Sequence, residues 1–241
     1  MTPLGLRIEP APKGLVPLPA KVLACRQIDR LDPQLAAAFK VSTDYPALGL
    51  VTCDSDDALY VALDHATKAA EVQVVFGRSF YAGSKHASGP FSGEALGILG
   101  SASQDDIAEA LWALREGLSD GIQFHTFESK AGEPHPAFFA HVIAETGRYL
   151  SAQAGIPAGS PMAYLIAPPL ESVVGLDAAL KAARVTLVKH FPPPSETNFG
   201  GGYLAGELPE VEAAAVAFVE AIRGVAAAPL SALRRPERLR R

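Results

Sequence analysis

The sequence predicts an α+β protein made of two tandem copies of one domain. The pattern D-x-A-x-K-A-A-x-V-x-x-V at residues 64–75 recurs at residues 177–188, and every matched pair is offset by 113 positions. This offset is close to half of the 241 residues, and the helix and strand patterns around the match agree as well. Two similar units in one chain suggest a pseudo-symmetric building block for a larger symmetric assembly.

The first copy reads as β-α-β-β-α. Its elements are a strand at 48–51, a helix starting at Ser55, strands at 72–75 and 95–99, and a helix starting near Ser103. Ser55 is placed to cap the first helix, and Asp56 and Asp57 in its first turn offset the exposed N–H groups. Both helices have apolar residues at helical spacing, which are Leu59, Ala62, Leu63, Ala66 and Ala70, then Ile107, Ala110, Leu111, Leu114 and Leu118.

The second copy repeats this order. Its elements are a strand at 163–167, a helix at 172–183, strands at 185–188 and 203–205, and a closing helix with Val211, Ala214, Ala215, Phe218, Ile222 and Val225 on one face. With one further strand, each unit forms a ferredoxin-like, antiparallel-containing sheet with helices on one face. Between the copies, residues 129–136 read as a surface loop, and an amphipathic segment through Phe139, Val142, Ile143 and Thr146 leads into the second copy.

Composition predicts two further segments, one before the first unit and one after the second. We expect a proline-rich leader at 1–19, domains at 20–124 and 125–228, and a basic tail at 229–241. Five prolines in residues 1–20 favour an extended leader over a folded element. The net charge is −5, but residues 234–241 contribute +4, so the rest of the chain carries −9.

Charge and hydropathy exclude two classes of partner. An acidic body argues against nucleic acid, and no apolar run approaches the roughly 18–20 residues of a membrane span. The first residues contain no apolar signal-peptide region. We therefore expect a cytoplasmic protein.

No catalytic constellation is present, so we expect neither an enzyme nor a cofactor. The six histidines show no HExxH or similar ligand spacing, and no G-x-S-x-G motif occurs. Asp54, Asp56 and Asp57 could bind a metal through hard oxygens, but neutralising a helix start is a sufficient structural role. We therefore predict no metal site.

Several unusual strings then occur in order: DSDD at 54–57, DHATK at 64–68, FGRSFYAG at 76–83, SGE at 92–94, HVIAETGRYL at 141–150, PMAYLIAPPLE at 161–171 and PPPSETN at 192–198. Over roughly residues 20–228 the chain resembles the EutL family, the ethanolamine-utilization shell proteins of bacterial microcompartments. The resemblance implies two circularly permuted shell domains per chain and a trimer shaped like a hexamer. Such tiles would pack edge to edge into a sheet around enclosed enzymes.

The resemblance also implies a small-molecule site, because EutL-type proteins bind ethanolamine in small pores. The matching positions are Asp56, Asp57, Glu94, Phe124, Thr197, Asn198 and Phe199. The chemistry agrees, since a small ammonium alcohol needs carboxylates for its charge, an aromatic face and polar partners for its other end. Binding and helix capping are compatible roles for Asp56 and Asp57, because a carboxylate has several acceptor sites.

The longer strand-to-strand loop of the first copy is expected to gate a central pore on the threefold axis. It is about seven residues longer than its counterpart, with 25 steps from Val75 to Gly100 against 18 from Val188 to Gly206. Glycines give it turning points, and its cations would meet those of the other two loops. The gate residues are Gly77, Arg78, Ser79, Phe80, Tyr81, Ala82, Gly83, Lys85 and His86.

We therefore expect a structural protein, a trimeric shell tile that passes small metabolites without turning them over. Its partners would be two further copies of the chain, other shell proteins along its edges, and a small amine such as ethanolamine. The alternative is a trimeric small-molecule sensor of ferredoxin-like topology that forms no shell. A tile should form sheets or tubes at high concentration, whereas a sensor should stop at the trimer.

Overall fold

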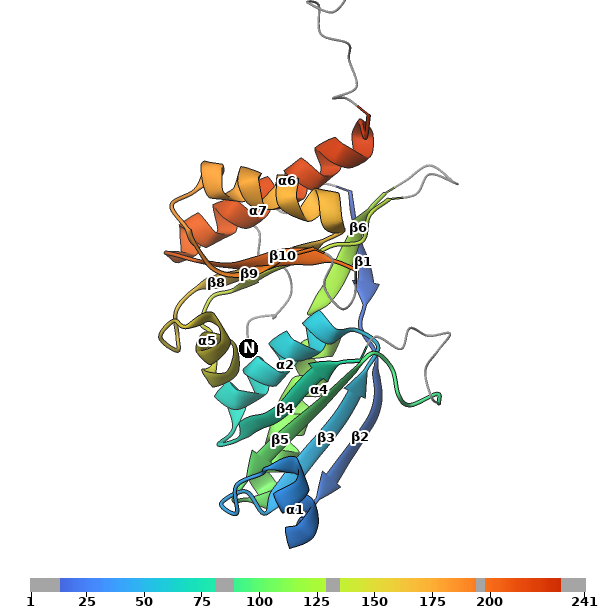
Figure 1. Cartoon of the computed structure of the whole chain (residues 1–241), viewed down its shortest axis with the longest axis vertical. Helices are drawn as coiled ribbons and strands as arrows, with labels where there is room; N and C mark the ends of the chain where they lie inside the picture. Colours follow the sequence, from blue (N-terminus) through green and yellow to red (C-terminus); the bar gives the residue numbers. More distant parts are fainter. Residues whose placement is uncertain (1–13, 81–88, 129–134, 194–197, 231–241) are drawn as a thin grey trace, which may run out of the picture.

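The computed structural model describes residues 14–80, 89–128, 135–193 and 198–230. Figure 1 shows two four-stranded sheets, one above the other, each with two long helices packed on it, and a two-stranded ribbon beside them. All paired strands that are described run antiparallel. The chain is thus an α+β protein of two layered units, as predicted.

The first repeat forms the lower sheet, with strand order β2-β3-β5-β4. Its elements are β2 (Val22–Ile28), α1 (Pro33–Phe39), β3 (Ala47–Cys53), α2 (Asp56–Ala69), β4 (Gln73–Ser79), β5 (Ala95–Ser101) and α4 (Gln104–Ser119). Ser103 caps α4 by accepting hydrogen bonds from the N–H groups of Asp105 and Asp106, as its position suggested.

The second repeat forms the upper sheet, with the matching order β7-β8-β10-β9. Its elements are β7 (Phe139–Ile143), α5 (Arg148–Ala154), β8 (Met162–Ala167), α6 (Pro169–Ala182), β9 (Thr186–Phe191), β10 (Gly200–Ala205) and α7 (Leu208–Ala227). Each repeat therefore contains the predicted β-α-β-β-α order, preceded by one more strand and one short helix.

The repeat offset is confirmed element by element. Helices α2 and α6 each have 14 residues and start 113 positions apart, as do β4 and β9. The segment between β4 and β5 covers residues 80–94, whereas the segment between β9 and β10 covers 192–199, so the first is seven residues longer, as predicted. The domain boundaries at 20–124 and 125–228 stay predictions.

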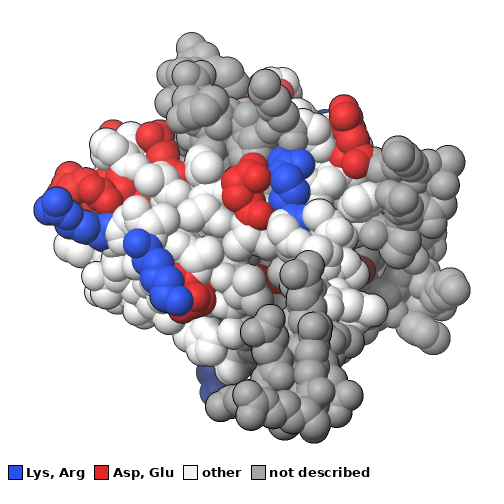
Figure 2. Space-filling model, turned by 90° about the horizontal axis from the view of Figure 1, so that it is seen from above, with Lys and Arg blue, Asp and Glu red and all other residues white. Residues whose placement is uncertain are grey.

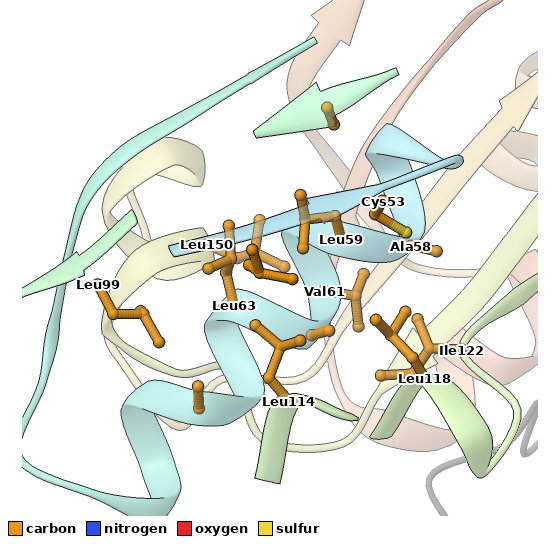
Figure 3. Packing of buried hydrophobic residues seen from close by; sticks show 14 of the residues in the cluster. Cys53, Ala58, Leu59, Val61, Leu63, Leu99, Leu114, Leu118, Ile122 and Leu150 are labelled. Atoms are coloured by element: carbon orange, nitrogen blue, oxygen red, sulfur yellow. The ribbon is translucent and has the colours of Figure 1, made fainter. Parts of the chain in front are cut away.

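The core of the first repeat continues into the second. Leu59, Leu63, Ile107 and Leu114 are fully buried between the helices and the lower sheet. Figure 3 shows Leu150, from α5 of the second repeat, lying among these side chains. The upper sheet has its own core under α6 and α7, so the two units share one apolar junction and each keeps a core of its own.

Part of the predicted leader is folded, which corrects the sequence analysis. Strand β1 (Leu15–Pro19) pairs with β6 (Gln123–Phe127), and Pro17 lies opposite His125. Two prolines can occupy this strand because β1 pairs on one edge only, so the positions that lack an N–H can face away from β6. Residues 1–13 and 231–241 lie outside the described residues.

The segment that leads into the second copy also differs from the sequence interpretation. Residues 139–143 form β7, and all five are buried, so the segment is a core strand and not amphipathic. Its apolar spacing arises because β7 is covered on both faces, which removes the alternation of a half-exposed strand. Within the described residues, no helix has the length and apolar character to cross a membrane.

Candidate functional site

A cavity of about 410 Å³ opens where the ribbon meets the start of α2. Its walls come from both repeats and from the ribbon, and they are Leu18, Pro19, Ala20, Asp54, Ser55, Asp56, Glu94, Phe124, Ala137 and Phe199. Three carboxylates and two phenylalanine rings therefore face one space. We call it the ribbon cavity.

The backbone around β3 brings the carboxylates together. Asp54 follows β3 and accepts a hydrogen bond from the N–H of Lys21 at 2.6 Å. The N–H of Glu94 donates to the carbonyl of Cys53 at 2.8 Å. Gly93 has a φ of +63°, and a Cβ there would lie 2.3 Å from that carbonyl oxygen, so glycine is required for this approach.

Aromatic rings form the opposite wall. The rings of Phe124 and Phe199 meet edge to face with centroids 5.7 Å apart, and Phe124 also packs against Phe139 of β7 at 5.2 Å. These contacts hold the Phe124 ring in place between the ribbon and the upper sheet.

A second cavity of about 400 Å³ lies on the other side of Asp56, and we call it the tyrosine cavity. Its walls are Asp56, Asp57, Tyr60, Gly77, Arg78, Ser79, Tyr149, Gln153, Tyr164, Ile166 and Phe191. The Tyr164 hydroxyl donates a hydrogen bond to Asp57. Asp56 lines both cavities, so the first turn of α2 stands between them.

The acidic groups are crowded and partly removed from water. Burial and then the neighbouring Asp56 raise the pKa of Asp57 well above its usual range. Burial, followed by Asp56 and Asp54, also raises the pKa of Glu94. A cation placed among these carboxylates would relieve the repulsion that adds to the effect of burial on both pKa values. The arrangement favours a small cationic ligand.

The structure brings together four of the seven predicted ligand residues, because Asp56, Glu94, Phe124 and Phe199 line the ribbon cavity. Asp57 instead faces the tyrosine cavity. Asn198 has a left-handed backbone with φ of 63° and an exposed side chain that is not part of either wall. Thr197 lies outside the described residues. The binding roles of all seven stay predictions.

The first three residues of the predicted gate segment lie in a strand. Gly77, Arg78 and Ser79 belong to β4, where they pair with Gly97, Leu96 and Ala95 of β5. The N–H of Phe80 continues the pairing to the carbonyl of Glu94 at 3.0 Å. Gly77 is needed for close packing, because a Cβ there would lie 2.5 Å from the Tyr149 hydroxyl.

Five other residues of the predicted gate have no described position. Tyr81, Ala82, Gly83, Lys85 and His86 lie outside the described residues. The gating role of the segment therefore stays a prediction.

Sequence reasoning missed six of the ten wall residues of the ribbon cavity, among them Leu18, Pro19 and Ser55. Leu18 and Pro19 belong to the segment interpreted as an unfolded leader, although a short apolar run that contains prolines is compatible with an edge strand. Ser55 was predicted to cap α2, but its side chain makes no capping hydrogen bond. Its Oγ is buried and has no hydrogen-bond partner among the described residues, although other atoms of Ser55 line the ribbon cavity.

Comparison with known proteins agrees with the fold. Residues 47–99 match the BMC domain family. The bacterial microcompartment shell proteins EutL of Salmonella typhimurium and of Escherichia coli strain K12 are each 43% identical over 209 residues, which is 87% of this chain and 94% of theirs.

Solved structures give the same result. A crystal structure of EutL from Clostridium perfringens matches with a TM-score of 0.85 at 41% identity, covering 90% of this chain and 98% of that one. EutL from Leptotrichia buccalis matches with a TM-score of 0.84 at 43% identity, covering 91% and 99%. The shell protein PduB shares the fold, with a TM-score of 0.68 at 21% identity over 86% and 89% of the two chains.

Two tandem BMC-type domains with these relatives define a shell protein of bacterial microcompartments, a structural protein and not an enzyme. The sequence identity and the coverage of these matches also identify the family within this class. The chain belongs to the EutL family of shell proteins. Its place is therefore the microcompartment shell, which excludes the sensor alternative.

Proposed function

We propose that three chains form a hexagon-shaped shell tile, and that the ribbon cavity binds a small protonated amine such as ethanolamine. The relative from Leptotrichia buccalis is described as an ethanolamine utilization protein, which supports this amine for the present chain. Tiles of this kind would pack edge to edge with other shell proteins and let small metabolites pass.

The observation that carries the ligand proposal is the composition of the ribbon cavity. Asp54, Asp56 and Glu94 supply negative charge on one side, and Phe124 and Phe199 supply ring faces on the other. An ammonium group interacts favourably with both kinds of wall.

Calorimetry with ethanolamine tests the site. Asp56→Asn and Glu94→Gln each remove one charge while keeping the size of the side chain. One hydrogen bond to a charged group contributes about 1.5–3 kcal/mol, so each variant should bind roughly 10- to 100-fold more weakly. Glu109→Gln is the matched control, because Glu109 is an exposed acid on α4 and does not line the cavity.

Two controls keep the result specific. Ethanol lacks the ammonium group and should bind far more weakly than ethanolamine, whereas ethylamine should keep most of the affinity. If Asp56→Asn and Glu94→Gln both bind ethanolamine as tightly as the wild-type chain does, Asp56 and Glu94 have structural roles only and the amine site is disproved.

A further inference from the structure

Aromatic rings and carboxylates together surround the tyrosine cavity. The rings belong to Tyr60, Tyr149, Tyr164 and Phe191, and the carboxylates belong to Asp56 and Asp57. These walls come from the first two turns of α2, from α5 and from the upper sheet. The volume of about 400 Å³ lies within the range of sites that bind small molecules. The amine proposed for the ribbon cavity leaves the tyrosine cavity without a ligand.

The ring cluster around this cavity already attracts one ammonium group. The Lys189 Nζ lies 5.5 Å from the centroid of the Phe191 ring and 5.8 Å from that of Tyr203. Lys189 is not a wall residue of the cavity, so this ammonium group lies outside it. The negative face of an aromatic ring attracts cations. The same property makes the rings inside the cavity suitable for a cationic ligand.

The tyrosine hydroxyls of the walls are already engaged within the protein. Their hydrogen-bond partners are Asp57 for Tyr164, Gln153 for Tyr149 and the backbone of Ser79 for Tyr60. An ammonium group with three N–H donors is best held by three acceptors. A quaternary ammonium group has no N–H and needs only ring faces and nearby negative charge. The cavity therefore suits a quaternary ammonium group better than a primary one.

The cationic wall residue Arg78 directs its side chain away from the rings. Arg78 pairs with Leu96 of β5, and Leu96 packs in the apolar cluster of Leu31, Leu48 and Ile98. The preceding residue, Gly77, faces the Tyr149 hydroxyl instead. Successive residues of a strand point to opposite faces of the sheet. The Arg78 guanidinium therefore leaves the sheet on the face opposite to the cavity, where it does not compete with a bound cation.

Asp57 has a neutral partner, unlike acids on the outer face of the molecule. Its carboxylate accepts a hydrogen bond from the Tyr164 hydroxyl. On α6, by contrast, Asp177 forms an ion pair with Lys181 at 2.6 Å. Figure 2 looks down on the end of the molecule that carries α6 and α7, and it shows acidic and basic side chains next to each other there. A cation in the tyrosine cavity would thus lie beside a carboxylate whose partner carries no charge.

We propose that the tyrosine cavity is a second ligand site, which binds a small quaternary ammonium compound such as choline. The methylated nitrogen would lie against the rings of Tyr60 and Tyr149, and Asp56 and Asp57 would supply the negative charge. Asp56 lines both cavities, so the two ligands would lie on opposite sides of the first turn of α2. The proposal does not depend on the amine of the ribbon cavity.

Calorimetry with choline and with tetramethylammonium tests this site. Tyr60→Leu removes one ring and keeps an apolar side chain, so it should weaken the binding of both compounds roughly 5- to 30-fold. Tyr60→Phe keeps the ring and should change the affinity by less than about twofold. Tyr45→Leu is the matched control, because Tyr45 is a half-buried tyrosine of the first repeat that lines neither cavity. Tert-butanol, an uncharged compound of similar shape, should bind at least about tenfold more weakly than tetramethylammonium.

Three results would overturn the quaternary ammonium site. They are the absence of choline binding to the wild-type chain, equal binding of tetramethylammonium and tert-butanol, and equal choline affinity of Tyr60→Leu and the wild type. Choline binding that is weakened by Glu94→Gln but not by Tyr60→Leu would place choline in the ribbon cavity and overturn the site as well. Ethanolamine titrations of Glu94→Gln report on the ribbon cavity alone, so the failure of one site is distinguished from the failure of the other.

Discussion

At the scale of single residues, Asp56 and Asp57 show how neighbouring carboxylates take different roles. Asp56 lines both cavities, whereas Asp57 turns toward Tyr164 and accepts its hydrogen bond. Burial and the nearby Asp56 raise the pKa of Asp57, so ionising Asp57 costs free energy in the folded chain. A cation bound beside Asp57 would offset this free-energy cost.

Asp57→Asn should therefore stabilise the fold at alkaline pH. The folded pKa of Asp57 lies above its unfolded value, so its contribution to stability is fully present below the unfolded pKa of about 3.9 and is lost as pH rises through the folded pKa. The midpoint of thermal unfolding of the variant should exceed that of the wild type at pH 8, and the gap should close toward pH 4. An equal gap at all pH values, or the same gain in Glu109→Gln, would argue against this account.

At the scale of elements, α5 depends on a carboxylate from the other repeat. Asp64 accepts two backbone hydrogen bonds at the start of α5, and Gly147 is required there because a Cβ would lie 2.5 Å from the carbonyl oxygen of Asp64. A short helix is marginal by itself. Its order therefore comes from this anchoring and from the burial of Leu150.

Asp64→Ala should loosen α5 and weaken the whole chain. It leaves two buried N–H groups without partners, which costs about 2–5 kcal/mol of unfolding free energy. Hydrogen exchange of residues 148–154 should speed up at least tenfold. Asp177→Ala is the matched control at the same repeat position, because it breaks only the exposed pair with Lys181, worth about 0–1 kcal/mol.

The elements also show what the sequence could predict. Long helices with apolar stripes, such as α2 and α4, are recognisable because local periodicity reports their burial. Strand β1 was missed because its prolines hide a strand paired on one edge, and β7 because burial on both faces removes alternation. Helices α1 and α5 were missed because seven residues are too few to show a period.

The candidate site was predictable only in part. Asp56, Glu94, Phe124 and Phe199 come from four distant places in the sequence, and only the resemblance to a family placed them in one predicted group of seven. These four line one cavity, and their binding roles stay predictions. Leu18 and Pro19 could not be added, because their positions depend on the pairing of β1 with β6. That pairing is a long-range contact with no local signal.

At the scale of the whole molecule, the repeated unit predicts the assembly. Three chains of 25.2 kDa should sediment together at about 76 kDa. Electron microscopy at high concentration should show flat sheets or tubes, and dilution should disperse these before it splits the trimers, since contacts between tile edges are smaller than contacts inside a ring. A chain that stays monomeric at micromolar concentration would rule out the tile.

The ribbon has a consequence for synthesis of the chain on the ribosome. Pro19 pairs with Gln123, 104 positions later, so at roughly 5–20 residues per second the first strand waits about 5–20 s for its partner to be made. An apolar strand left open for that time can associate with other nascent chains. Pro17 and Pro19 have no backbone N–H to donate in such contacts. The two prolines therefore lower the tendency of the unpaired β1 to aggregate before β6 has been synthesised.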